Sequence, residues 1–170
     1  PPPGLPSSPW PALPPGSGYR IAGNLTINNA SNSIWTGFLP GDNVILWVDG
    51  NFNITGNGSM TINTNTSLVL YVSGNSLNIG GTGDGLANQN GTQFPQRLQI
   101  YCTPNCTSMS VTGGPDLVAA VKAPGADITI GGTPAYYGAV IGNDITASGG
   151  GGIHFDEQLL IGPIDPEGKD

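Results

Sequence analysis

The chain has 170 residues, which is enough for one domain with its own hydrophobic core. Only 9% of the residues are charged, and the formal net charge is -7 with four Lys and Arg. So few cations cannot neutralise phosphates, which argues against a nucleic-acid partner. No apolar run approaches the roughly 20 residues that cross a bilayer, so no membrane insertion of this segment is expected.

Residues 1–18, PPPGLPSSPWPALPPGSG, are predicted to form an extended arm. Proline removes backbone donors and favours polyproline-like geometry, so this stretch cannot be a helix or a central strand. We expect the arm to dock on a neighbouring molecule through Leu5, Trp10 and Leu13, the alternative being a flexible tether. At the other end, residues 163–170 are predicted to be a polar tail outside the core.

Between these ends, residues 19–162 show apolar and polar residues in alternation, as in NLTIN, LVLYVSG and ADITIGG. Helical spacing does not occur in this part of the sequence, and Gly, Asn or Asp follows each short run. The pattern predicts a single all-β domain.

The predicted strands also repeat one another. ILWVDGNFNITGNG at 45–58 aligns with VLYVSGNSLNIGGTG at 69–83, so that Gly50 matches Gly74, and DITIGG at 127 returns as DITASG at 144. Such repeats are typical of a parallel β-helix, or β-solenoid, whose coils bury their apolar faces on one another. A β-sandwich is the alternative. Residues 84–116 are interpreted as a loop-rich interruption around one or two strands.

Three motifs after residue 117 carry a resemblance to a known family. They are A-P-x-A at 123–126, Y-G-A-x-x-G at 137–142 and H-x-D-E at 154–157. With these motifs the segment resembles an uncharacterised extracellular β-solenoid domain of bacterial surface and pilus-assembly-type proteins. The resemblance implies a secreted or surface-exposed β-helical module and supplies no catalytic residues.

Three aromatic residues, Trp35, Trp47 and Tyr71, are candidates for a face that stacks on sugars. Trp47 and Tyr71 occupy equivalent repeat positions, so the alternative is a packing ladder that only stabilises adjacent coils.

Two further groups suggest local chemistry. Cys102 and Cys106, in YCTPNCTS, are a possible disulfide, with two free thiols as the alternative. Asp84, Asn88 and Asn90 lie in a Gly-rich stretch that approaches a calcium-binding turn, although such residues also form turns without an ion. No metal or cofactor is expected to be resident.

His154 and Asp156, two residues apart in a predicted strand, should point to the same side. We interpret them as a structural pair whose hydrogen bond fixes the last coil, with a catalytic or metal-binding pair as the alternative.

The carboxylates of the chain are scattered through turns, and no nucleophile motif accompanies them. The sequence therefore predicts a non-enzymatic extracellular or cell-surface structural protein. We expect a pilus-like filament or surface subunit that assembles with copies of itself through the arm and open solenoid edges. The alternative is an adhesive module that binds extracellular polysaccharide.

Overall fold

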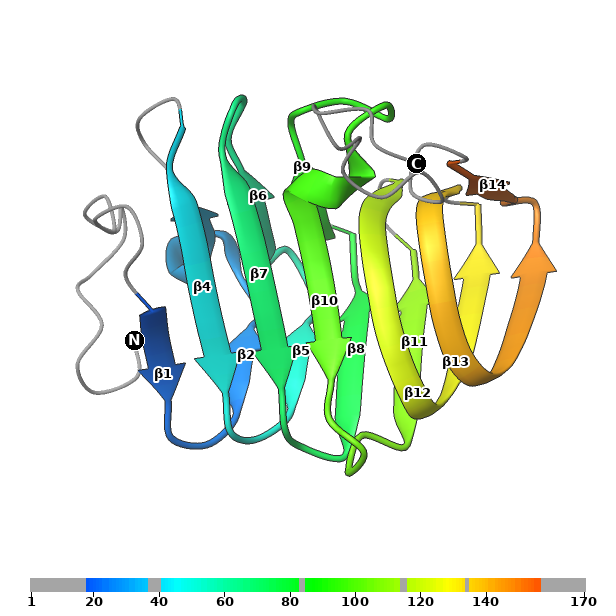
Figure 1. Cartoon of the computed structure of the whole chain (residues 1–170), viewed down its shortest axis with the longest axis horizontal. Helices are drawn as coiled ribbons and strands as arrows, with labels where there is room; N and C mark the ends of the chain where they lie inside the picture. Colours follow the sequence, from blue (N-terminus) through cyan, green and yellow to red (C-terminus); the bar gives the residue numbers. More distant parts are fainter. Residues whose placement is uncertain (1–17, 37–40, 83–84, 114–115, 134, 157–170) are drawn as a thin grey trace, which may run out of the picture.

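The computed structural model describes residues 18–36, 41–82, 85–113, 116–133 and 135–156, and within them the chain winds into a parallel β-solenoid (Figure 1). Every strand pairing is parallel, and successive coils stack along one axis. Two short 3₁₀ turns, η1 (Ala30–Asn32) and η2 (Pro95–Arg97), are the helical elements of the described residues. The all-β prediction and the solenoid are confirmed, and the β-sandwich is wrong.

The coils have up to three sides. The first side is formed by β1 (Gly18–Ile21), β4 (Asn43–Val48), β7 (Ser67–Val72) and β10 (Leu98–Cys102). The second side is formed by β2 (Leu25–Ile27), β5 (Phe52–Ile54), β8 (Ser76–Gly80) and β11 (Ser108–Thr112). The third side is a three-stranded sheet of β3 (Ile34–Thr36), β6 (Ser59–Ile62) and β9 (Gly85–Asn88).

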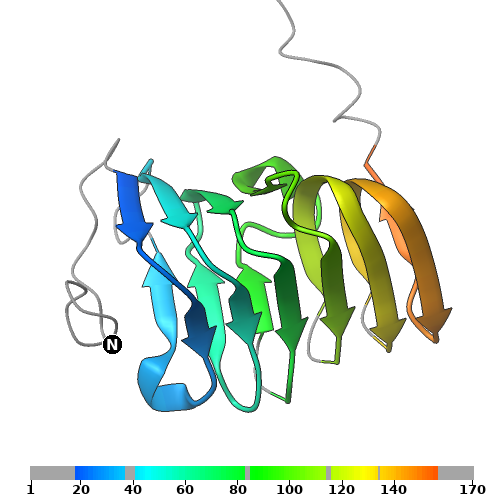
Figure 2. The same cartoon turned by 90° about the horizontal axis from the view of Figure 1, so that it is seen from below.

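The last coils are narrower. The long strands β12 (Leu117–Gly132) and β13 (Tyr136–Gly149) each bend from the first side to the second, which joins both sides into one 11-stranded sheet (Figure 2). The register shifts at the bend of β12, between Ala123 and Asp127. The final strand, β14 (Ile153–Phe155), lies on the first side.

The register confirms the repeats that the sequence shows. Val48 pairs with Val72, which is a step of 24 residues (72 - 48), and Asp127 pairs with Asp144, a step of 17 (144 - 127). Residues 84–116, interpreted as an interruption, instead contain β9, β10 and β11, all in register with the coil before them. That interpretation missed the continuity because the turns between these strands are longer than those of the earlier coils.

Apolar side chains at alternate positions fill one narrow interior. Leu68, Leu70 and Val72 of β7 are fully buried, and the intervening residues face outward. At a corner of the coil, Asn side chains bond to the next coil: the N–H of Asn51 donates to Oδ1 of Asn24 (2.8 Å), and that of Asn75 to Oδ1 of Asn51 (2.9 Å). These bonds satisfy turn backbone without charged groups.

The motifs behind the family resemblance shape the narrow coils. Gly138 has a φ of +134°, and a Cβ there would collide with the carbonyl oxygen of Ala119. At the bend of β13, a Cβ on Gly142 would lie 2.7 Å from Cδ1 of Ile128. Glycine is therefore required at position 138, whereas a side chain at position 142 would force the side chain of Ile128 to shift.

Candidate functional site

The C-terminal end of the solenoid has an open strand edge. β12 pairs with β13 along most of its length, up to Gly132 and Gly149, whereas β14 pairs only with residues 136–138 of β13. Among the strands of the described residues, none pairs with the remaining edge of β13, residues 139–149 (Figure 1). We call residues 139–149 the open edge; its outward backbone groups are available to another strand.

Apolar side chains are exposed along this edge. We call a set of residues that pair with one another in successive coils a row. One such row, which faces the interior, runs through Leu77, Met109 and Ile128 and ends at Ile145. Ile128 is 1% exposed, but Ile145 is 39% exposed because no further coil covers it. Ile141, on an outward row, is 54% exposed. The interior is therefore uncapped at this end of the described chain.

The opposite end presents the edges of β1 and β2, the two strands at which the large sheet begins and ends. β2 carries no charge, and its Leu25 and Ile27 are buried. On β1, the Nε of Arg20 donates to both carboxylate oxygens of Asp49 at 3.0 Å, while its side chain stays 74% exposed. Such an exposed ion pair contributes little stability.

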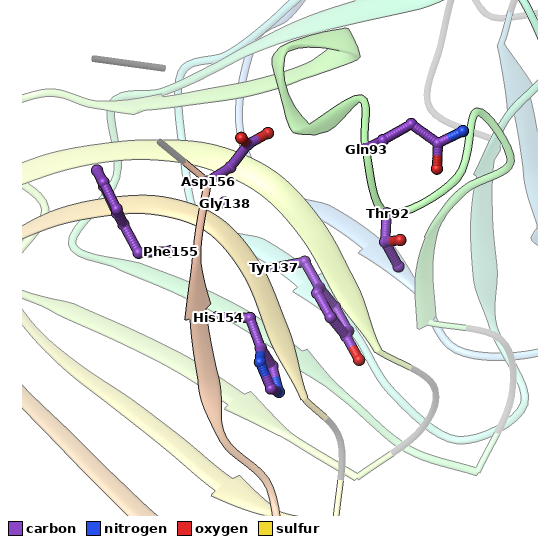
Figure 3. A pocket seen from close by; sticks show the side chains of 7 residues that line it. All are labelled: Thr92, Gln93, Tyr137, Gly138, His154, Phe155 and Asp156. Carbon is purple, nitrogen blue, oxygen red and sulfur yellow. The ribbon is translucent and has the colours of Figure 1, made fainter. Parts of the chain in front are cut away.

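A cavity of about 210 Å³ lies beside β14 (Figure 3). Its lining comes from the segment after β9 and from β13 and β14: Thr92, Gln93, Tyr137, Gly138, His154, Phe155 and Asp156. The imidazole of His154 stacks on the ring of Tyr137, with centroids 4.7 Å apart and planes at 12°. The stack follows from the register, which places His154 beside Tyr137.

The structure does not pair His154 with Asp156. The two residues line one cavity, but the Asp156 carboxylate points away from the imidazole (Figure 3). Asp156 follows the last residue of β14, so its side chain does not continue the alternation of that strand. The ring of Tyr137 is the partner of His154.

An aromatic ladder crosses three coils on the first side. Trp47 stacks on Tyr71 with ring centroids 4.6 Å apart, and Tyr71 on Tyr101 with centroids 5.2 Å apart. Tyr101 extends the stack of Trp47 and Tyr71 by one coil, because LQIYC pairs in register with LVLYV of the preceding coil. Because the rings stack face to face, the faces that a sugar would need are largely occupied by neighbouring rings.

Trp35 does not belong to this aromatic ladder. Its backbone lies in β3 on the third side, paired with Thr61 of β6, whereas Trp47 and Tyr71 lie on the first side. Its side chain is outside the described part of the structure. The backbone of Trp35 thus lies on a different side of the coil from Trp47 and Tyr71.

Cys102 and Cys106 are free thiols in the structure, both buried in the core. The hydrogen bond between the two thiols, together with burial, raises the pKa of Cys102. The same hydrogen bond lowers the pKa of Cys106 to about 7. The thiol of Cys106 also donates to the carbonyl oxygen of Ser108 at 3.6 Å.

The calcium candidates are engaged in the turn itself. Asn88 donates to the carbonyl oxygens of Phe94 and Val118, both at 3.1 Å, and its Oδ1 accepts from Asn90. Oδ1 of Asn90 accepts from the N–H of Asn65. Asp84 lies outside the described residues, and among those that are described no three His, Cys, Asp or Glu side chains form a metal-binding group.

The predicted arm anchors, Leu5, Trp10 and Leu13, also lie outside the described residues. Within the described ranges, no helix has the length and hydropathy of a membrane-crossing segment.

Comparison with known proteins identifies one family. A family model described as a domain of unknown function, DUF7305, matches residues 16–160. The match spans most of the chain, far beyond the three motifs after residue 117, so the chain belongs to this family. No curated protein and no solved structure matches it.

Proposed function

We propose that this member of the DUF7305 family is a non-enzymatic structural subunit that assembles with copies of itself outside the cell or on its surface. Its coils would continue from one molecule into the next, giving a filament or a layered surface structure. The observation that carries this proposal is the uncapped interior at β13, where Ile145 is 39% exposed while its neighbour in the row, Ile128, is 1% exposed.

The charge distribution of the open edge supports the same role. Natural sheets guard exposed edges with charged residues, prolines or bulges that prevent pairing with another chain. Residues 139–149, AVIGNDITASG, contain a single charged residue, Asp144, and it lies on an outward row with Asp127. An edge with so little protection suits pairing with a further strand.

An extracellular location is supported by the resemblance of the C-terminal motifs to surface β-solenoid domains. Those motifs form the two narrow coils, so the resemblance and the open edge concern the same part of the molecule. The arm, residues 1–18, remains a proposed contributor to assembly.

Carbohydrate binding is the second candidate function, favoured by the partial exposure of the aromatic ladder. Trp47 is 37% exposed and lines a depression with Ile45, Arg20 and Gly18. We rank it below assembly because Tyr71 lies between two other rings. Retention of the chain on polysaccharide, lost on Trp47→Ala, would support it.

The test of assembly compares the unmodified chain with two variants of one edge. Ile145→Asp places a charge in the interior row, where an unpaired carboxylate is costly, so it should reduce assembly strongly. Ser148→Asp adds the same charge on the exposed side of β13 and should reduce assembly much less. Sedimentation velocity and electron microscopy over a range of concentrations measure both. An unmodified chain that stays monomeric throughout contradicts the proposal.

A further inference from the structure

We propose that the molecules join head to tail in one register, with β1 and β2 of one copy pairing with the open edge of β13 in the next. This inference rests on the proposed function, and it adds which strands meet and in which alignment. The two partner surfaces lie at opposite ends of the solenoid, β1 and β2 at one end and β13 with β14 at the other (Figures 1 and 2). Such a heterologous contact generates an open chain of subunits.

The strand registers fix the alignment on the first side. Tyr19 pairs with Leu46, and the same row continues through the coils to Val121 and Val140. The four residues of β1 therefore share rows with residues 139–142 of β13. β14 covers residues 136–138 and Asp156 still bonds Gly138, so Tyr19, Arg20 and Ile21 of a second copy fit the positions opposite residues 140–142, which β14 leaves empty.

The second side gives the same alignment independently. Leu25 pairs with Phe52, and that row runs through the interior to Ile128 and Ile145. The three residues of β2 thus share rows with residues 145–147. A second copy would place Leu25 over the exposed Ile145; Leu25 is already buried, so the burial gained at this contact is that of Ile145.

The polar groups at this junction are also compatible. By the same register Asn24, which precedes β2, comes opposite Asp144, so an amide that can donate meets a carboxylate that accepts. The Oδ1 of Asn24 already accepts a hydrogen bond from the N–H of Asn51 in the following coil, and its Nδ2 is a donor. No like charges are brought together in these rows.

In this junction, β14 of one copy and β1 of the next copy would lie end to end along the same edge of β13. The N–H of Asp156 still donates to the carbonyl oxygen of Gly138 at 3.2 Å, so Asp156 takes the position opposite Ala139 and β1 of the second copy can pair only from Val140 onward. In the second copy the position opposite Ala139 corresponds to Gly18, so Gly18 has to leave the edge there and pairing begins at Tyr19.

Cysteine cross-linking tests the register. Thr26 and Thr146 share an outward row, so in the proposed junction their Cα atoms lie about 4.8 Å apart, within disulfide range. Ser148, two residues further on the same face, would lie about 8 Å from Thr26, which is too far for a disulfide. Within one chain Thr26 and Thr146 are five strands apart, about 24 Å, so any bond between them joins two molecules.

We expect a mixture of the Thr26→Cys and Thr146→Cys variants to form reducible dimers under mild oxidation, and the double variant to form a ladder of longer species. The matched mixture of Thr26→Cys and Ser148→Cys should give little product. Cys102 and Cys106 are buried and present in all variants, so the unmodified chain controls for them. Arg20→Cys with Ile141→Cys provides a second pair, on the first side.

The outcomes separate this inference from the function on which it rests. If the unmodified chain does not assemble in sedimentation experiments, the proposed function fails. If it assembles but neither in-register pair cross-links, or the Ser148 pair cross-links as readily, the register is wrong while the structural role stands. Circular dichroism of each variant verifies that the fold is kept.

Discussion

The middle of the solenoid and its C-terminal end are built from the same kind of strand but differ in what covers them. In the coil of β7, β8 and β9, the interior residues Leu70, Leu77 and Leu86 are at most 2% exposed, because coils stack on both sides. In β13 and β14, Ile145 and Phe155 belong to the same architecture yet remain exposed. Burial of Ile145 thus depends on a further coil, which the described residues do not supply at this end.

The largest expected difference between the two regions comes from making the same substitution, Phe to Ala, in each. Phe52→Ala, in a fully buried side chain of β5, should lower the free energy of unfolding by about 3–5 kcal/mol. Phe155→Ala, in β14, should lower it by less than about 1 kcal/mol in the isolated chain, since that ring is 52% exposed. Denaturant unfolding measures both, and equal losses would contradict the contrast.

Two glycines near the C-terminal end differ in whether a Cβ can be accommodated. Gly138→Ala forces an L-residue into a φ of +134° and a collision with Ala119, which should cost about 2–4 kcal/mol of stability. Gly150→Ala introduces a Cβ with no atom within 4 Å and should change stability by less than about 0.5 kcal/mol. Thermal melting compares them, and a Gly138→Ala variant as stable as the control would contradict the fit.

A smaller effect is expected from the buried phenol of Tyr136, whose hydroxyl lies 2.8 Å from the carbonyl oxygens of Ala119 and Ala139. Burial raises the pKa of Tyr136, so the folded chain keeps this proton after the unfolded chain has begun to lose it. Stability should therefore be unaffected by this group at neutral pH and fall as the pH rises above about 10.

Tyr136→Phe should remove that alkaline loss, while costing about 1–2 kcal/mol at neutral pH through the loss of the hydroxyl's hydrogen bond to these carbonyl oxygens. Denaturant unfolding at several pH values measures both effects. The same alkaline slope in Tyr136→Phe as in the unmodified chain would show that another group titrates.

The smallest effect concerns the aromatic ladder outside the core. Tyr71→Ala removes the central ring and both stacking contacts, for a loss of about 1–2 kcal/mol, whereas Tyr71→Phe keeps the ring and should be nearly neutral. Thermal melting of the two variants separates stacking from the hydroxyl. If Tyr71→Ala is as stable as Tyr71→Phe, the ladder serves something other than stability.

The repeat was the part of the fold that could be predicted from the sequence. The alignment of Gly50 with Gly74 and of Asp127 with Asp144 gives the register that the structure shows, because like residues stack on like in successive coils. The third side could not be predicted, since β3 and β9 are short and follow irregular turns. The alternation of apolar and polar residues also does not reveal which coil is the last one. The exposure of Ile145 could therefore not be predicted from the sequence.

The candidate site was less predictable for a related reason. Trp35 and Trp47 are both tryptophans in short strands, and composition alone does not distinguish the side of the coil on which each lies. For His154 and Asp156, alternation held only while the strand lasted, and β14 ends at Phe155. The open edge was predicted in general terms, as a property of any solenoid, but not its location.

The step of 24 residues between β4 and β7 has a consequence for how such proteins change in length. A coil that presents the same rows above and below can be duplicated or lost as a unit, because its neighbours then meet surfaces of unchanged shape. Genetic gain or loss of whole coils would alter the length of the rod in increments of about 4.8 Å while the two ends stay the same.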